Sequence, residues 1–424
     1  MKRFLGCLAM AAAIIPAFAQ GSTLSPYSQY GVGEYAPLGG SVNRGMNGLG
    51  MGVRGGTLVN PLNPASYASV DSLTMLFDMG LSGQITNFNE NGAKRNARSA
   101  SFEYVMGSFR AWKNVGITFG VLPLTNVGYK YGTTETLADV NTSVTTVHQG
   151  DGGLHQLFIG AGVRPVKPLS FGFNVSYLWG GYDRSVTSSS SSTINSLSKI
   201  YSATVHNYTL DFGMQYDQPI GKSDLLTVGI TYGLGHKLNT DAECLIISTN
   251  STVSKADTTR LTAANALELP HTFGAGFSYT HAAQWMVGAD VQLQQWSKTK
   301  FPDYVDGQYA VYSGLLDNSY RVTVGGEWCP RWNSRNFFHR IRYRAGVGYT
   351  TPYYKINGQE GPRQISASIG FGIPIVNGYN NRSHLNISAQ YVNNAASGLI
   401  KENTFRLNIG ITFNEKWFAK WKVE

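Results

Sequence analysis

The chain has 424 residues, a formal net charge of +9 and only 14% charged residues, whereas 12% of its residues are aromatic. This composition excludes a disordered chain, which carries more charge and fewer aromatic residues, and no basic cluster supports binding to nucleic acid. A mean hydropathy of −0.16 excludes a bundle of membrane-spanning helices, because each such helix needs about 20 consecutive apolar residues.

Residues 1–19 have the pattern of a signal peptide. Lys2 and Arg3 form a positively charged start, an apolar stretch follows, and small residues precede a cleavage position after Ala19. The apolar stretch is too short to span a membrane. We expect residues 1–19 to direct export and to be removed.

Residues 20–72 show neither the alternation of a strand nor the stripe of a long helix. Ten glycines lie between Gly31 and Gly56, and Asn63-Pro64-Ala65 follows. A compact, glycine-rich segment ahead of a barrel can fold into the lumen, and the lumen of about fourteen strands is wide enough to need a filling. We expect residues 20–72 to form a hatch, in which Asn63, Pro64 and Ala65 make either a closing turn or a gate that moves with ligand.

Residues 73–413 are dominated by alternation between apolar and polar or small residues. The last such segment places Phe405 and Leu407 on one face and Arg406 and Asn408 on the other. About fourteen segments of this kind predict an all-β, antiparallel fold with an even number of strands. They lie near residues 73–85, 98–106, 115–122, 155–163, 169–182, 202–216, 224–238, 269–280, 285–296, 320–328, 338–350, 363–373, 382–391 and 403–413.

Alternation is also typical of a soluble β-sandwich, whose apolar face points inward. Three features favour apolar side chains that face lipid: the export signal, polar faces rich in Gly, Asn, Gln and Thr, and aromatic residues near strand ends such as Tyr320 and Trp328. Short turns alternate with longer connections, including expected external loops at 123–154 and 239–268. The sequence therefore predicts a transmembrane β-barrel of about fourteen strands in the lipid of a Gram-negative outer membrane.

The predicted inward faces of the strands carry charged side chains. These are Asp78, Glu103, Asp211, Asp290, Arg321, Glu327, Arg342, Arg344 and Arg406. We expect them either to form ion pairs that pack against the hatch, or to form a charged girdle that binds the headgroup of a substrate.

Two cysteines remain after export. Cys244 falls in an expected external loop and Cys329 at an expected periplasmic turn, so we predict that they form no disulfide. Neither has the spacing of a zinc site, and the chain has no HExxH or GxSxG motif. We expect no catalytic residue, no metal and no cofactor, and the chain is not predicted to be an enzyme.

Two stretches resemble FadL-type outer-membrane transporters of hydrophobic compounds such as toluene, xylene and long-chain fatty acids. The first runs from Gly48 through Asn63-Pro64-Ala65 into the first strand. The second has Leu-Pro, Gly-x-x-Tyr, Trp, Gly-Ala-Asp and Trp-Ser in that order between Leu269 and Ser297. The resemblance implies a hatch inside fourteen strands and passive uptake of small hydrophobic or amphipathic molecules.

The resemblance also implies a kinked third strand that opens the barrel wall sideways. Gly120 and Pro123 are the candidates for this kink, because proline removes a donor from the ladder of hydrogen bonds. A strand that ends at Pro123 is the simpler expectation.

Two other functions fit the same architecture. The glycine-rich stretch and the Asn-Pro-Ala motif also resemble PorV-type shuttles of the type IX secretion system. That resemblance implies a non-transporting platform, whose external loops or C-terminal tail at 414–424 bind protein partners. A simple porin with an open lumen is the third alternative. The polar inward faces weigh against a lipid ligand unless the hatch and external loops supply an apolar lining.

Overall fold

The structure is a computed structural model that describes residues 24–90, 92–137, 142–190, 195–250, 255–375 and 383–415. The expected signal peptide at 1–19 and residues 416–424 of the expected tail lie outside the described residues. The last strand continues through Asn414 and Glu415. Within the described ranges, no helix is long and apolar enough to cross a membrane.

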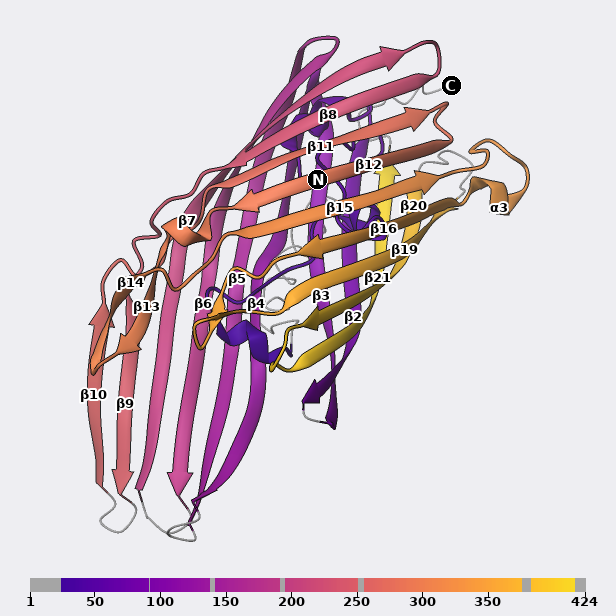
Figure 1. Ribbon diagram of the computed structural model, residues 1–424. Helices are drawn as coiled ribbons and strands as arrows, with labels where there is room; N and C mark the ends of the chain where they lie inside the picture. Colours follow the sequence, from indigo (N-terminus) through magenta and orange to yellow (C-terminus); the bar gives the residue numbers. More distant parts are fainter. Residues whose placement is uncertain are drawn as a thin grey trace, which may run out of the picture.

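Fourteen antiparallel strands close into a barrel, which confirms the predicted fold class (Figure 1). The closing seam joins the first and last wall strands, because β21 pairs with β2 from Met75 opposite Glu415 to Asn89 opposite Lys401. In order around the wall, the strands are β2 (Met75–Glu90), β3 (Ala93–Trp112), β4 (Val115–Leu137), β5 (Thr142–Val166), β6 (Leu169–Ser190), β7 (Asn195–Ile220), β8 (Asp224–Gly233), β11 (Thr272–His281), β12 (Trp285–Gln294), β15 (Ser319–Trp328), β16 (Arg342–Thr350), β19 (Arg363–Ile375), β20 (Ser383–Ala395) and β21 (Lys401–Glu415).

The apolar side chains of the wall strands point outward. In β21 the side chain of Phe405 is 56% exposed, whereas that of Asn408 on the other face is 5% exposed. Leu157 and Ile159 in β5 and Val291 in β12 are exposed in the same way. An apolar surface that continues around the wall is too large for a soluble protein, so it faces lipid.

The expected external loops at 123–154 and 239–268 are largely strand, so that part of the prediction is wrong. β4 to β7 contain 22 to 26 residues each, whereas about ten residues cross a membrane. The strands β9 (Ala242–Asn250) and β10 (Lys255–Ala263) extend the same sheet. These strands project far beyond the rest of the wall in Figure 1.

The projecting strands turn their apolar side chains inward, which is the reverse of the lipid-facing wall. Val127, Leu178 and Leu238 are buried there beside Tyr309. Tyr309 belongs to a hairpin, β13 (Lys300–Val305) and β14 (Gln308–Ser313), that packs against the inner face. This part of the molecule therefore has a core like that of a soluble β-protein.

The opposite end of the barrel has short connections, and we assign it to the periplasm because outer-membrane barrels place short turns there. β3 and β4 are joined by two residues, Lys113 and Asn114, and β5 and β6 by Lys167 and Pro168. The connection at 329–341 is longer and contains α3 (Phe337–Arg340). The predicted strand start at 338 is therefore wrong, and β16 begins at Arg342.

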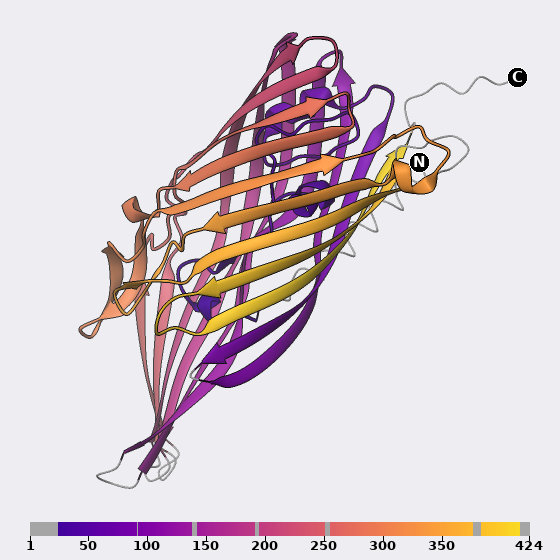
Figure 2. The same ribbon diagram turned by 45° about the vertical axis from the view of Figure 1, so that its right-hand side comes forward.

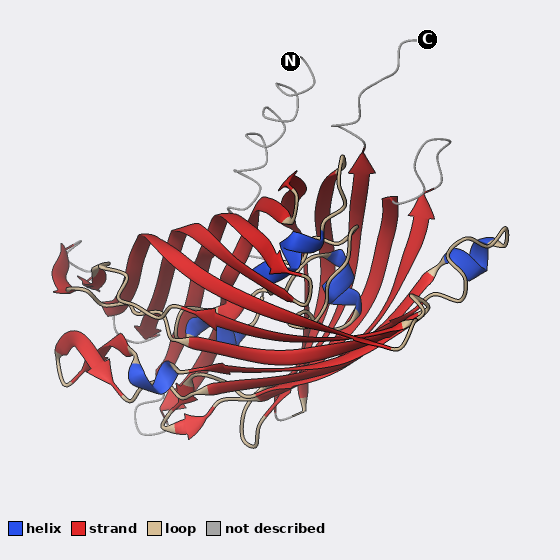
Figure 3. Cartoon of the chain, turned by 90° about the horizontal axis from the view of Figure 1, so that it is seen from above, coloured by secondary structure: helices blue, strands red, loops and turns tan. Residues whose placement is uncertain are grey.

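The segment before β2 lies inside the barrel, and the strands enclose its short helices in Figure 3. Its elements are η2 (Pro26–Gln29), β1 (Glu34–Tyr35), α2 (Ser41–Gly45) and η3 (Pro64–Ser69). α2 packs against β19, β20 and β21, whereas η3 packs against β4 to β7 on the other side of the lumen. We call residues 24–72 the hatch.

Both cysteines of the described chain are free, as predicted, and both are buried, which was not predicted. Cys244 lies in β9 rather than in a loop, and Cys329 follows β15 at the periplasmic end. For the chain that begins at Gln20, we expect a thiol-reactive probe to label neither cysteine in the folded barrel and both after unfolding. Counting the added labels by mass spectrometry tests this, and a labelled folded barrel would contradict the burial of these thiols.

Candidate functional site

The hatch rests directly on glycines of the inner wall. A Cβ atom at Gly229 would lie 1.9 Å from the carbonyl oxygen of Met51, and one at Gly116 would lie 1.9 Å from that of Tyr67. A Cβ at Gly172 would lie 2.3 Å from Pro64. A side chain would clash at these positions, because the backbone of the hatch packs directly against the backbone of the wall.

Asn63, Pro64 and Ala65 form the N-terminus of η3. The side chain of Asn63 accepts a hydrogen bond from the Ala65 N–H at 3.1 Å. Pro64 occupies the first turn of η3, where a backbone N–H would have no partner within the helix, so proline is well suited there. Asn63 also donates to the carbonyl oxygens of Met51 at 2.8 Å and Met214 at 3.2 Å. This motif thus ties two parts of the hatch to β7, and its role as a gate stays a prediction.

Three of the predicted lumen charges hold the hatch. Asp290 accepts hydrogen bonds from the N–H groups of Gly50 at 2.6 Å and Met51 at 2.9 Å. Asp78 accepts from the hydroxyl of Ser41 at 3.0 Å. The third, Glu103, forms an ion pair with Arg44 of the hatch.

Glu103 forms a buried ion pair of 3.0 Å with Arg44 of the hatch. A β-bulge in β3 leaves Glu103 without a partner residue on β2, because Gly80 pairs with Tyr104 and Leu81 pairs with Phe102. The bulge turns Glu103 toward the lumen beside Tyr104, and Arg44 lies over the Tyr104 ring at 5.0 Å.

Other predicted lumen charges are paired within the wall. Glu327 binds Arg344 at 2.7 Å and also Arg342. Arg406 donates to Gln84 at 2.9 Å and to Gln390 at 3.0 Å. These charged groups are thus bound by other wall residues.

A further ion pair was not among the predicted site residues. Arg54 of the hatch binds Asp217 at 2.7 Å, and Arg164 approaches the same carboxylate at 3.4 Å. Asp217 follows the last outward tyrosine of β7, and strand alternation alone would have placed it inward. The partner Arg54 carries no such pattern, so its contact was not predictable.

The wall is divided between β3 and β4 in its external half. The two strands pair only as far as Val105 opposite Val121. Beyond that point, β1 of the hatch runs along β4 in place of β3, and Ala36 donates its N–H to the carbonyl oxygen of Leu124 at 3.1 Å. Figure 2 shows the external ends of β2 and β3 apart from the converging tips of the long strands.

The predicted kink residues lie at this division. Gly120 is in the last paired stretch of β3 and β4, and the register of β4 against β5 shifts between Pro123 and Thr125. β4 continues to Leu137, so the strand does not end at Pro123, contrary to the simpler expectation. An opening of the wall at this kink stays a prediction.

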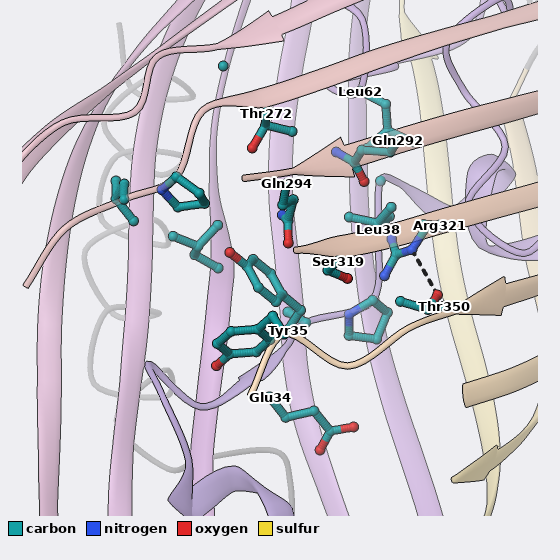
Figure 4. A pocket seen from close by; sticks show the side chains of 18 of the residues that line it. Glu34, Tyr35, Leu38, Leu62, Thr272, Gln292, Gln294, Ser319, Arg321 and Thr350 are labelled. Atoms are coloured by element: carbon teal, nitrogen blue, oxygen red, sulfur yellow. Dashed lines mark hydrogen bonds between the residues drawn. The ribbon is translucent and has the colours of Figure 1, made fainter. Parts of the chain in front are cut away.

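A cavity of about 310 Å³ lies on the external side of the hatch (Figure 4). Its apolar lining includes Leu38 and Leu62 of the hatch and Leu122 of β4. Polar side chains from wall strands on several sides converge on the cavity; they are Gln156, Thr209, Asp211, Thr231, Thr272, Gln292, Gln294, Ser319, Arg321 and Thr350. Two predicted lumen charges, Asp211 and Arg321, are therefore cavity residues rather than hatch contacts.

The chain's family follows from comparison with known proteins. The family model described as BamG matches residues 1–424. The chain belongs to the BamG family. No relative among the curated proteins matches it.

Solved structures similar to this BamG-family chain include two toluene transporters and a FadL homologue. Ralstonia pickettii TbuX is 12% identical with a TM-score of 0.61, covering 89% of this chain and 98% of TbuX. The Pseudomonas aeruginosa FadL homologue is 12% identical with a TM-score of 0.59, covering 90% and 98%. Pseudomonas putida TodX is 12% identical with a TM-score of 0.58, covering 91% and 100%. The fold is thus that of the FadL-type barrels, and the chain is an outer-membrane β-barrel.

Aromatic side chains close the external side of the cavity in this BamG-family barrel. The Tyr353 ring stacks on Trp296 at 4.7 Å between centroids and meets Tyr35 of the hatch edge-on at 5.8 Å. The Tyr353 hydroxyl donates to the carbonyl oxygen of Gly33 at 2.5 Å and accepts from the Val32 N–H at 3.1 Å. Burial raises the pKa of Tyr353, so the phenol keeps its proton and remains a donor.

In the described ranges, no three His, Cys, Asp or Glu side chains come together in a way that could hold a metal ion. Asp78, Asp290 and Glu103 are instead engaged with the hatch and Glu327 with arginines, whereas Asp211 lines the cavity. The arrangement can bind a small molecule above the hatch, in a cavity that has apolar walls and convergent polar groups.

Proposed function

We propose that this chain takes up small hydrophobic or amphipathic molecules passively across the outer membrane. The observation that carries the proposal is the cavity on the external side of the hatch, which combines leucines with convergent polar groups. Its volume of about 310 Å³ suits a molecule of modest size. The FadL-type fold supports the proposal, because the neighbours TbuX and TodX are named as toluene transporters.

In this proposal the ligand leaves the cavity sideways at β4. Leu122, Pro123 and Leu124 line the cavity and form the stretch of β4 where pairing with β3 has ended. β1 pairs with the edge of β4 at Thr125 and Asn126, and Ala36 bonds to Leu124, so release would require that β1 separate from β4. Arg321 and Asp211 would orient the polar end of an amphipathic ligand, while the leucines contact its apolar part.

Replacing Gln292 with tryptophan should block uptake. Gln292 points into the cavity (Figure 4), and an indole there would occupy much of the space that a ligand needs. We expect liposomes containing the Gln292→Trp barrel to take up a labelled aromatic or fatty acid at least about fivefold more slowly than those with the unaltered barrel.

The matched control is Val291→Trp, which adds the same side chain one residue away on the exposed, lipid-facing side of β12. This control should leave the uptake rate unchanged. If the unaltered barrel is no faster than protein-free liposomes, the uptake proposal is wrong.

The second candidate is a non-transporting platform that binds protein partners, as in type IX secretion. The projecting sheet of β4 to β7, β9 and β10 favours it, because its own apolar core stabilises a folded external surface to which a protein partner could bind. Stoichiometric protein partners after mild solubilisation, together with an absence of uptake, would support the platform. Uptake by the purified barrel alone would count against it.

A further inference from the structure

The longest described connection at the periplasmic end, residues 329–341, is an ordered structure. We call it the β15–β16 loop. The N–H of Arg331 donates to the carbonyl oxygen of His339 at 2.9 Å, which closes the loop on itself. The Asn336 side chain caps α3 by accepting from the Phe338 N–H at 3.0 Å. The loop conformation is thus defined by its own hydrogen bonds.

This ordered loop exposes large aromatic side chains. Trp332 and Phe338 are each 66% exposed, and Phe337 is exposed beside them. The loop has a defined conformation, and this conformation leaves the three rings exposed instead of packed against the barrel. Exposed aromatic groups of this size mark a surface that contacts lipid or protein.

The same loop is positively charged. It contains Arg331, Arg335 and Arg340 and no acidic residue. None of the three arginines forms an ion pair with a described residue. The Nε of Arg340 is buried without a hydrogen-bond partner in the described part of the chain, and its guanidinium lies 5.9 Å from the Phe337 ring centre. Guanidinium groups that have no ion-pair partner are suited to binding an anion such as a phosphate.

The loop begins at the aromatic girdle of the barrel. Trp328 is the last residue of β15 and Tyr343 the second residue of β16, their tilted rings lie 5.5 Å apart between centroids, and the side chain of Trp328 is exposed. The Tyr343 hydroxyl donates to the carbonyl oxygen of Phe338 at 3.2 Å, which ties α3 to the girdle. In Figure 1, α3 projects past the neighbouring ends of β15 and β16. The loop therefore lies at the depth of the lipid headgroups.

We propose that the β15–β16 loop binds anionic phospholipid headgroups in the periplasmic leaflet of the outer membrane. The arginines bind the phosphates, and the rings of Trp332, Phe337 and Phe338 rest at the boundary between headgroups and acyl chains. The loop would thus select the lipids around one side of the barrel. This inference is independent of whether the barrel transports a ligand.

A fluorescent reporter in the loop tests the proposal. Asn333→Cys gives a single exposed thiol, because the native Cys244 and Cys329 are buried, and an environment-sensitive dye is attached there. The labelled full-length mature barrel is placed in vesicles of phosphatidylcholine and phosphatidylglycerol in which only one of the two lipids is brominated. The ratio of quenching by the two brominated lipids reports their relative abundance next to the loop.

We expect phosphatidylglycerol to quench more strongly than its share of the vesicle lipid predicts. Replacing all three arginines by glutamine should reduce this preference at least about tenfold. Trp332→Ala should weaken quenching by both lipids. The matched control removes three exposed cations, Lys94, Arg95 and Arg98, from the far end of β3 and should leave the ratio unchanged.

Two results would overturn the proposal. Equal quenching by both lipids in the unaltered loop would mean that the arginines do not select anionic headgroups. A water-exposed dye that neither lipid quenches would place the loop in the periplasm, where a protein partner is the better explanation of its exposed rings.

Discussion

Gly229→Val should expel the hatch from its seat and leave the wall strands in place. Even a Cβ atom at this position would lie 1.9 Å from the carbonyl oxygen of Met51, which is backbone and has no rotamer to change. Overpacking of ordinary cores costs about 1–3 kcal/mol, and a clash with backbone should exceed that range. We expect a protease to cut residues 24–72 rapidly in the variant and slowly in the unaltered barrel.

The control for this experiment is Gly83→Val in β2. A Cβ at Gly83 meets no atom within 4 Å, and valine favours strands, so this barrel should resist the protease as the unaltered barrel does. A protease-resistant hatch in Gly229→Val would show that the hatch can shift on the wall without being released.

Arg44→Met should cause the largest loss of stability among changes to the ion pairs. The change leaves the Glu103 carboxylate buried in the lumen without its cation, and removal of one partner of a buried pair costs about 3–5 kcal/mol. The hatch should detach at a lower denaturant concentration than in the unaltered barrel. The barrel in detergent is titrated with urea. Release of the hatch at each urea concentration is detected by protease cleavage of residues 24–72.

Two further variants identify the cause of that loss. Adding Glu103→Gln to Arg44→Met removes the uncompensated charge and should recover part of the stability. Arg363→Met breaks the exposed pair with Glu360, which should change stability by no more than about 1 kcal/mol. Equal effects of the buried and exposed changes would refute the role of Arg44 in holding the hatch.

The fourteen wall strands could be predicted because the solvent on each face differs. Lipid outside and polar groups inside select opposite side chains at every second residue, as Phe405, Asn408 and Ile409 illustrate. The same reasoning placed Asp78 and Asp290 toward the lumen, where they bind the hatch. Glu103 was also predicted there, but it faces the lumen together with its neighbour Tyr104 because of the bulge in β3, which alternation does not predict.

The external strands could not be predicted in the same way. In the projecting parts of β5 and β6, Ser and Thr occupy both faces, for instance at Thr145, Thr146, Ser188 and Ser189. Such segments have no clear alternation, and they resemble solvated loops. Their pairing depends on neighbours that are distant in the chain, so it appears only in the folded barrel.

The contacts of the hatch were also beyond prediction. Arg44 meets Glu103 because of a bulge in β3, and no local pattern in the sequence announces that bulge. Likewise, glycines such as Gly229 read as ordinary small residues of a strand until the backbone of Met51 is found against them.

The seam between β2 and β21 has a consequence for the hatch. Residues 401–415 complete the wall by pairing with β2 along its length. Without this pairing the wall would be an open sheet, and its glycine-lined inner face would be accessible to the hatch from the side. Pairing of β21 with β2 closes the wall, so the hatch can no longer leave the lumen sideways through this seam.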